Sequence, residues 1–67
     1  MDRIDTQIIT HLQADGRLSI TELAERVGLT PTPCARRVQR LEADGVITGY
    51  SARVDAAKLG YPLTVFI

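Results

Sequence analysis

A chain of 67 residues in which eight basic side chains balance eight acidic ones forms one small domain, with a stability of a few kcal/mol. Its single cysteine excludes an internal disulfide and a cysteine-based zinc site, and favours a reduced, cytoplasmic environment. No stretch approaches the run of about 20 apolar residues that a membrane-spanning helix needs, so we expect no membrane partner.

The first predicted helix begins after Asp2, whose carboxylate is a suitable N-cap. Asp15-Gly16 is expected to end this helix. Asp5 falls within the apolar face, where a carboxylate needs a partner, and Arg37 of a later helix is the candidate. Four aliphatic residues recur at the helical period and form that face: Ile4, Ile8, Ile9 and Leu12.

The second predicted helix, residues 20–27, is short and has strong end signals. Ser19 and Glu22 form a capping box, in which each side chain accepts a hydrogen bond from the backbone N–H of the other residue. Gly28 is suited to the positive φ that follows a helix. Three apolar residues are expected to point inward: Leu23, Ala24 and Val27.

The third predicted helix lies within residues 30–45 and organises the rest of the chain. A Thr30-Pro31 start suits a helix N-terminus, because proline at the first helical position loses no hydrogen bond. Thr32 precedes Pro33, and a residue before proline avoids the α region, so the start could lie two residues later; we place the N-cap at Thr30. Gly45 is expected to cap the other end. Three apolar residues form the buried stripe: Cys34, Val38 and Leu41.

The face opposite this stripe is basic and polar. At about 100° per residue, Thr32, Arg36, Gln39 and Arg40 project away from the core. Arg36, Arg37 and Arg40 stand within five residues with no acid among them, which gives a neutral chain a local positive field suited to a polyanion. Two helices joined by a tight turn, the second with a basic face, indicate a helix-turn-helix over residues 22–41.

The sequence after Gly45 predicts mainly extended structure. Residues 46–54 are rich in β-branched side chains and indicate a strand, with Gly49 at a bend; this strand forms a wing or pairs with another chain. Asp55 is expected to cap one turn within a linker, residues 55–62, and residues 63–67 have the composition of a buried strand. Because an apolar strand at a chain end leaves an unprotected edge, we expect a longer protein.

The predicted fold is therefore mainly α. It is a three-helix, winged-helix-like helix-turn-helix domain over residues 1–45, followed by a hinge strand and the first strand of a missing α/β domain. No catalytic constellation accompanies this fold, so we expect no enzyme and no cofactor. Cys34 is interpreted as a small core residue, and His11 as an ordinary side chain at the surface or its boundary.

The sequence resembles the Lrp/AsnC (leucine-responsive regulator, or feast/famine) family of prokaryotic transcription regulators. The resemblance implies an N-terminal DNA-binding domain, a hinge strand and a C-terminal α/β domain that binds amino-acid effectors and assembles dimers or higher even-numbered oligomers. It further implies that an effector binds only the full-length protein, that residues 46–54 pair between subunits, and that the protein lies on the nucleoid. The resemblance covers nearly the whole chain and is carried by residues 2–5, 8–9, 15–17, 22–29, 30–34, 36–38, 40–42, 45–47 and 49–50, with Asp55 and Leu59-Gly60.

The candidates for contact with double-stranded DNA follow from the chemistry of bases and phosphates. Arginine can bind guanine as a fork, glutamine can bind adenine, and either can bind a phosphate instead. Threonines at a helix N-terminus suit phosphate or base-edge contact, helped by exposed N–H groups and the helix dipole. The main candidates are Thr30, Thr32, Arg36, Gln39 and Arg40.

Each candidate also has a structural interpretation. The basic face can be an ordinary solvated helix surface, and the threonines can act as caps alone. Arg37 lies nearer the apolar stripe, where pairing with Asp5 competes with DNA contact, so it is a weaker candidate. Four further side chains are weaker candidates, chiefly for phosphate: Ser19, which also serves as a cap, Thr21, Arg17 and Arg53. The alternative function is a protein-protein interaction module without DNA affinity, which would need an exposed apolar patch on the third helix.

Overall fold

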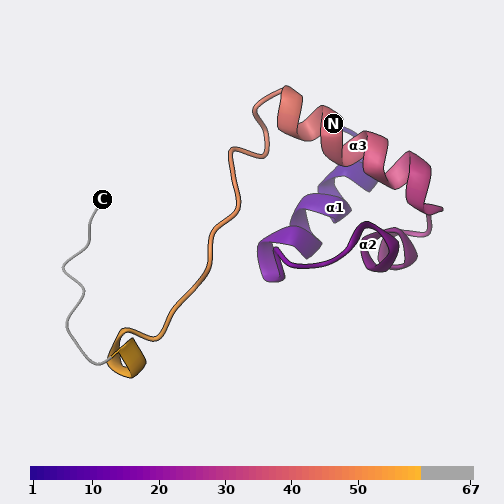
Figure 1. Ribbon diagram of the computed structural model, residues 1–67. Coiled ribbons are helices and arrows are strands. Elements are labelled where there is room, and N and C mark those ends of the chain that lie inside the picture. Colours follow the sequence, from indigo (N-terminus) through magenta and orange to yellow (C-terminus); the bar gives the residue numbers. More distant parts are fainter. Residues whose placement is uncertain (60–67) are drawn as a thin grey trace.

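The structure is a computed structural model that describes residues 1–59, and in this range it contains three α-helices, one 3-10 turn and no strand (Figure 1). The elements are α1 (Arg3–Ala14), α2 (Ile20–Val27), α3 (Pro31–Ala43) and the turn η1 (Ala56–Leu59). The prediction of a mainly α, three-helix unit is confirmed. The predicted strand at residues 63–67 and the last residues of the linker, 60–62, lie outside the described residues.

The core lies where the three helices meet. The predicted inward residues of α2 and α3 are all buried, whereas on α1 only Ile8 is fully buried and Ile4, Ile9 and Leu12 are partly covered. A helix packed against two others still leaves part of its apolar face at the edge of the core. The buried set is Ile8, Leu23, Ala24, Val27, Cys34, Val38 and Leu41.

Helix α1 begins and ends where the sequence predicts. The Asp5 N–H donates to Asp2 Oδ1 at 2.9 Å, which is the predicted N-cap. At the other end, Asp15 is the C-cap in an extended conformation, and its Oδ1 accepts from the Arg17 N–H at 2.9 Å. The helix therefore ends at Asp15-Gly16, as predicted. Gly16 has no positive φ, so the bonds of Asp15 to the local backbone turn the chain there.

The capping box of α2 forms in full. Ser19 Oγ accepts from the Glu22 N–H and Glu22 Oε1 accepts from the Ser19 N–H, both at 3.0 Å. Gly28 follows the helix with φ +75°, and the Leu29 N–H donates to the Ala24 carbonyl at 2.9 Å. These bonds cap both ends of a helix of only eight residues and set the tight turn into α3.

Helix α3 begins after Thr30, with Pro31 at the first helical position, so the start is at the earlier of the two predicted sites. The far end closes with the two hydrogen bonds of a Schellman motif. The Gly45 N–H donates to the Glu42 carbonyl at 3.1 Å, and the Val46 N–H donates to the Leu41 carbonyl at 3.0 Å. Gly45 has φ +75°, which confirms its predicted place after the helix.

Residues 46–54 do not form the predicted strand in the single chain. Residues 48–55 have no regular secondary structure, and Figure 1 shows this segment leaving the helices as an extended trace. A strand needs a neighbour to accept and donate its backbone hydrogen bonds, and residues 1–59 provide no second strand. The segment is held near α3 by the Tyr50 hydroxyl, which donates to Glu42 Oε2 at 2.8 Å. Pairing with a second chain stays a prediction.

The two left-handed glycines provide a test of these helix ends. Replacing Gly28 or Gly45 by alanine should lower the free energy of unfolding by about 1–2 kcal/mol, because an L-residue resists positive φ. No atom lies within 4 Å of an added Cβ at either position, so backbone strain alone carries the effect. Urea unfolding measures it. Gly49→Ala is the control, because that site is equally open and lacks positive φ; a similar loss there would contradict the explanation.

Candidate nucleic-acid interface

The outward face of α3 presents the side chains that the sequence assigns to it. Thr32, Arg36, Gln39 and Arg40 are all exposed, while the stripe on the opposite face is buried in the core. The predicted orientation of α3 is therefore confirmed. Contact of these side chains with DNA stays a prediction.

Arg36 and Arg40 are available to bind an anion. Within residues 1–59, neither guanidinium takes part in a salt bridge or a side-chain hydrogen bond, and both side chains are exposed. An exposed arginine without an internal partner keeps all five N–H donors for phosphate oxygens or base edges. The pair lies one helical turn apart, so both can reach one groove of a duplex.

Arg37 has the structural partner that the sequence predicts and a second one that it does not. Its Nη1 donates to Asp5 Oδ1 at 3.1 Å, and also to the two carboxylate oxygens of Asp2 at 2.9 and 2.8 Å. The hydrogen bond from Arg37 lowers the pKa of Asp2, and the same bond raises the pKa of Arg37. The spacing of Asp2 and Asp5, three residues apart on one side of α1, was the signal that both acids would meet Arg37.

The start of α3 offers fewer backbone N–H donors than the sequence predicts. Pro31 and Pro33 have no N–H, and the Cys34 N–H donates to the Thr30 carbonyl at 3.3 Å. The Thr32 N–H is thus the remaining donor of the first turn. Thr30 is the N-cap residue, but its side chain makes no capping hydrogen bond, so the interpretation of its hydroxyl as a cap alone is wrong. Both threonine hydroxyls lie on exposed residues.

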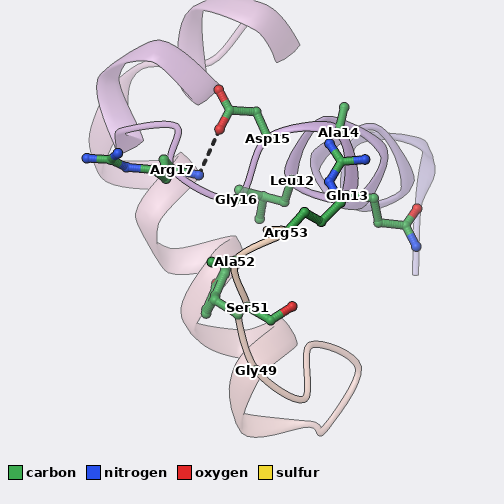
Figure 2. Close-up of a pocket in the computed structure, with 11 residues that line it drawn as sticks. Leu12, Gln13, Ala14, Asp15, Gly16, Arg17, Gly49, Ser51, Ala52 and Arg53 are labelled. Carbon is green, nitrogen blue, oxygen red and sulfur yellow. Dashed lines mark hydrogen bonds between the residues drawn. The ribbon is translucent and has the colours of Figure 1, made fainter. Parts of the chain in front are cut away.

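The weaker candidates lie on other elements. Ser19 is exposed, and its structural role as a cap is confirmed; Thr21 is exposed in the first turn of α2. Arg17 and Arg53 line a surface hollow of about 520 Å³ between the end of α1 and residues 49–53. Both side chains are labelled in Figure 2. These two arginines come from the loop after α1 and the segment after α3, so α3 does not position them.

The described part of the chain gives little support for a reactive cysteine or a metal site. Cys34 has none of its surface exposed, and burial raises the pKa of its thiol, in agreement with the predicted core role. Residues 1–59 contain no group of three potential metal ligands among His, Cys, Asp and Glu. In the same range, no helix has the length and apolar character needed to cross a bilayer.

The class of protein follows from this arrangement. A short helix, a tight turn and a second helix with an unpaired basic face form a helix-turn-helix. Residues 1–48 match the family described as winged helix-turn-helix DNA-binding, which includes all three helices. This part of the chain is a winged helix-turn-helix DNA-binding domain.

Similar proteins define the family. The chain is 53% identical over 66 residues to a leucine-responsive regulatory protein of Rhizobium meliloti (strain 1021), covering 98% of the chain and 42% of that protein. It is 52% identical over 67 residues to the leucine-responsive regulatory protein of Escherichia coli (strain K12), covering 100% of the chain and 41% of that protein.

Solved structures agree with these relatives. A transcriptional regulator from Neisseria meningitidis in complex with L-Met has a TM-score of 0.86 at 41% identity, over 88% of this chain and 38% of its own. An AsnC family transcriptional regulator from Agrobacterium tumefaciens has a TM-score of 0.83 at 47% identity, over 88% of this chain and 39% of its own. The chain belongs to the Lrp/AsnC family of transcription regulators. It spans about two fifths of the length of its curated relatives.

Proposed function

We propose that this chain is the sequence-specific DNA-binding part of a transcription regulator, with α3 in the major groove and α2 braced against the DNA backbone. The observation that carries the proposal is the pair Arg36 and Arg40, exposed on the second helix of a helix-turn-helix and unpaired within residues 1–59. A basic helix face anchored by a buried stripe fits the width of the major groove.

The proposed roles follow from side-chain chemistry. Arg36 and Arg40 bind guanine edges or phosphates, and Gln39, exposed on the same helix, binds adenine or a phosphate. Thr30 and Thr32 contact the DNA through their hydroxyls, since prolines remove most of the backbone donors around them. Three further side chains have secondary, phosphate-binding roles: Arg37, Ser19 and Thr21.

The proposal extends to assembly, because one short helix contacts few base pairs. We propose a homodimer or higher even-numbered oligomer on half-sites about one helical turn apart. Residues 46–54 act as the hinge strand that pairs between subunits, which agrees with the exposure of Val46, Tyr50 and Val54. Residues 55–62 are the linker, and residues 63–67 begin the effector and oligomerisation domain.

We further propose that the full-length protein responds to an amino acid, as the L-Met complex of the Neisseria relative suggests. The effector site belongs to the domain after the linker, and the protein acts in the cytoplasm on the nucleoid. The alternative, a protein-protein module, is not favoured: among residues 1–59, the exposed large apolar side chains all lie outside α3.

A titration of double-stranded DNA at two salt concentrations tests the proposed function. Affinity should fall with salt with a log-log slope of about −0.9 per phosphate contact, so three contacts would lower it about 40-fold between 50 and 200 mM salt. Fluorescence anisotropy of a labelled duplex measures this change. Absence of duplex binding at the lower salt would remove the proposal, because a protein-binding module has no reason to bind phosphate.

A further inference from the structure

Arg37 is only partly used by its two acidic partners. All three hydrogen bonds, to Asp2 and Asp5, come from Nη1. The Nε and Nη2 N–H groups donate to no partner within residues 1–59. Neither atom is fully buried, because no fully buried side-chain nitrogen or oxygen in that range lacks a partner. The side chain is 34% exposed. One edge of the guanidinium is thus fixed to α1, and the other keeps free donors that are not fully buried.

The free edge of Arg37 belongs to the same surface as Arg36 and Arg40. These three arginines line one hollow of about 250 Å³ together with Asp2 and Asp5. Three guanidinium groups outnumber the two carboxylates, and both carboxylates already accept hydrogen bonds from Arg37. An anion that enters beside Arg36 and Arg40 therefore meets a net positive charge and an arginine edge with free donors.

We propose that Asp2 and Asp5 are positioning residues, which hold Arg37 so that its Nε and Nη2 form a fork to a DNA phosphate beside Arg36 and Arg40. This inference rests on the proposed function. The Nε–Nη2 edge matches two oxygens of a phosphate. An arginine already held by carboxylates loses less side-chain freedom on binding than a free one, so the two acids improve phosphate binding in spite of their charge.

If Asp2 and Asp5 have the opposite role, the coupling between Asp2 and Arg37 in DNA binding has the opposite sign. If Asp2 and Asp5 only neutralise Arg37, removal of the Asp2 charge releases Arg37 and tightens DNA binding most when Arg37 is present. If they position Arg37, the same removal helps least when Arg37 is present, because loss of the support offsets the gain from lost repulsion. The coupling between the two residues decides between these roles.

The experiment is a double-mutant cycle of Asp2→Asn and Arg37→Gln. Asparagine retains the N-cap of α1, so Asp2→Asn removes charge without removing the cap. Each variant of the chain is titrated with a labelled mixed-sequence duplex of about 20 base pairs, two helical turns, which suffices for phosphate contacts. Circular dichroism checks that each variant is folded.

We expect Arg37→Gln to reduce the magnitude of the salt slope by about 0.9, which a merely structural role would not do. We expect Asp2→Asn to tighten binding at least about threefold more in the Arg37→Gln background than in the wild-type background. No coupling, coupling of the opposite sign, or an unchanged slope in Arg37→Gln would overturn the inference.

If Arg37→Gln fails to fold, the DNA affinity of Arg37→Lys decides whether Asp2 and Asp5 position Arg37. Lysine keeps the charge but cannot hold the carboxylates with one edge and a phosphate with the other. Positioning requires clearly weakened binding in Arg37→Lys, and wild-type affinity in that variant would reject it. Wild-type protein that does not bind duplex would instead reject the proposed function, so the two failures are distinguishable.

Discussion

Replacing Arg36 or Arg40 by alanine is expected to weaken specific DNA binding by about 1–3 kcal/mol for each residue, roughly a 5- to 150-fold rise in Kd. The loss should be of this size if each guanidinium forms a fork to a guanine edge. Folding should be unchanged, because both side chains are exposed and make no ion pair within residues 1–59. A loss of affinity in either variant can therefore be attributed to lost DNA contacts and not to lost stability.

The measurement needs a specific site, which selection of duplexes from a random pool provides. Arg26→Ala is the matched control: it removes the same charge from an exposed position, but from the last turn of α2 instead of the outward face of α3. Affinities are compared at one salt concentration. If Arg36→Ala and Arg40→Ala bind as Arg26→Ala does, the outward face of α3 does not recognise the DNA.

Leu23→Ala is expected to lower the free energy of unfolding by about 2–5 kcal/mol, because it leaves a cavity in the centre of the core. Leu23 is 1% exposed and packs at the junction of the three helices. A domain of this size has a stability of only a few kcal/mol, so the loss takes most of it. The variant should be substantially unfolded in dilute urea, where the wild-type chain is folded.

Urea unfolding followed by circular dichroism at 222 nm, the usual helical signal, records the shift of the midpoint. Leu59→Ala is the control, since it removes the same atoms from a leucine that is 43% exposed. A small effect at Leu59 and a large one at Leu23 are expected. Equal midpoints for the two variants would show that the three-helix core is not what stabilises this chain.

The helix boundaries are where sequence reasoning succeeded most fully. Ser19 and Glu22 meet each other across one turn, and Gly28 and Gly45 take the left-handed conformation that most other residues resist. The first helix also ends at Asp15-Gly16 as predicted, but there the Asp15 side chain turns the chain and Gly16 does not take positive φ. A capping side chain and a left-handed glycine both act through residues only a few positions apart in the sequence. At Asp15-Gly16 either one could have ended the helix.

The candidate interface was predicted in part. The period of Cys34, Val38 and Leu41 determined which side of α3 faces outward. The pairing of Arg37 with Asp5 followed from the need of a half-buried carboxylate for a partner. The larger contribution of Asp2 was missed, because an N-cap carboxylate already has a local partner, although the spacing of three residues places Asp2 and Asp5 on the same side of α1.

The sequence by itself determined the three helices, their ends and the arginine-bearing outward face of α3, since these depend on capping contacts and apolar periodicity within single turns. Only the tertiary structure decided that Arg36 and Arg40 stay unpaired within residues 1–59 while Arg37 is bound to Asp2 as well as Asp5. It also decided that residues 46–54 form no strand in the single chain. Salt bridges and strand ladders join groups far apart in the chain, so their formation depends on which partners the folded molecule brings within reach.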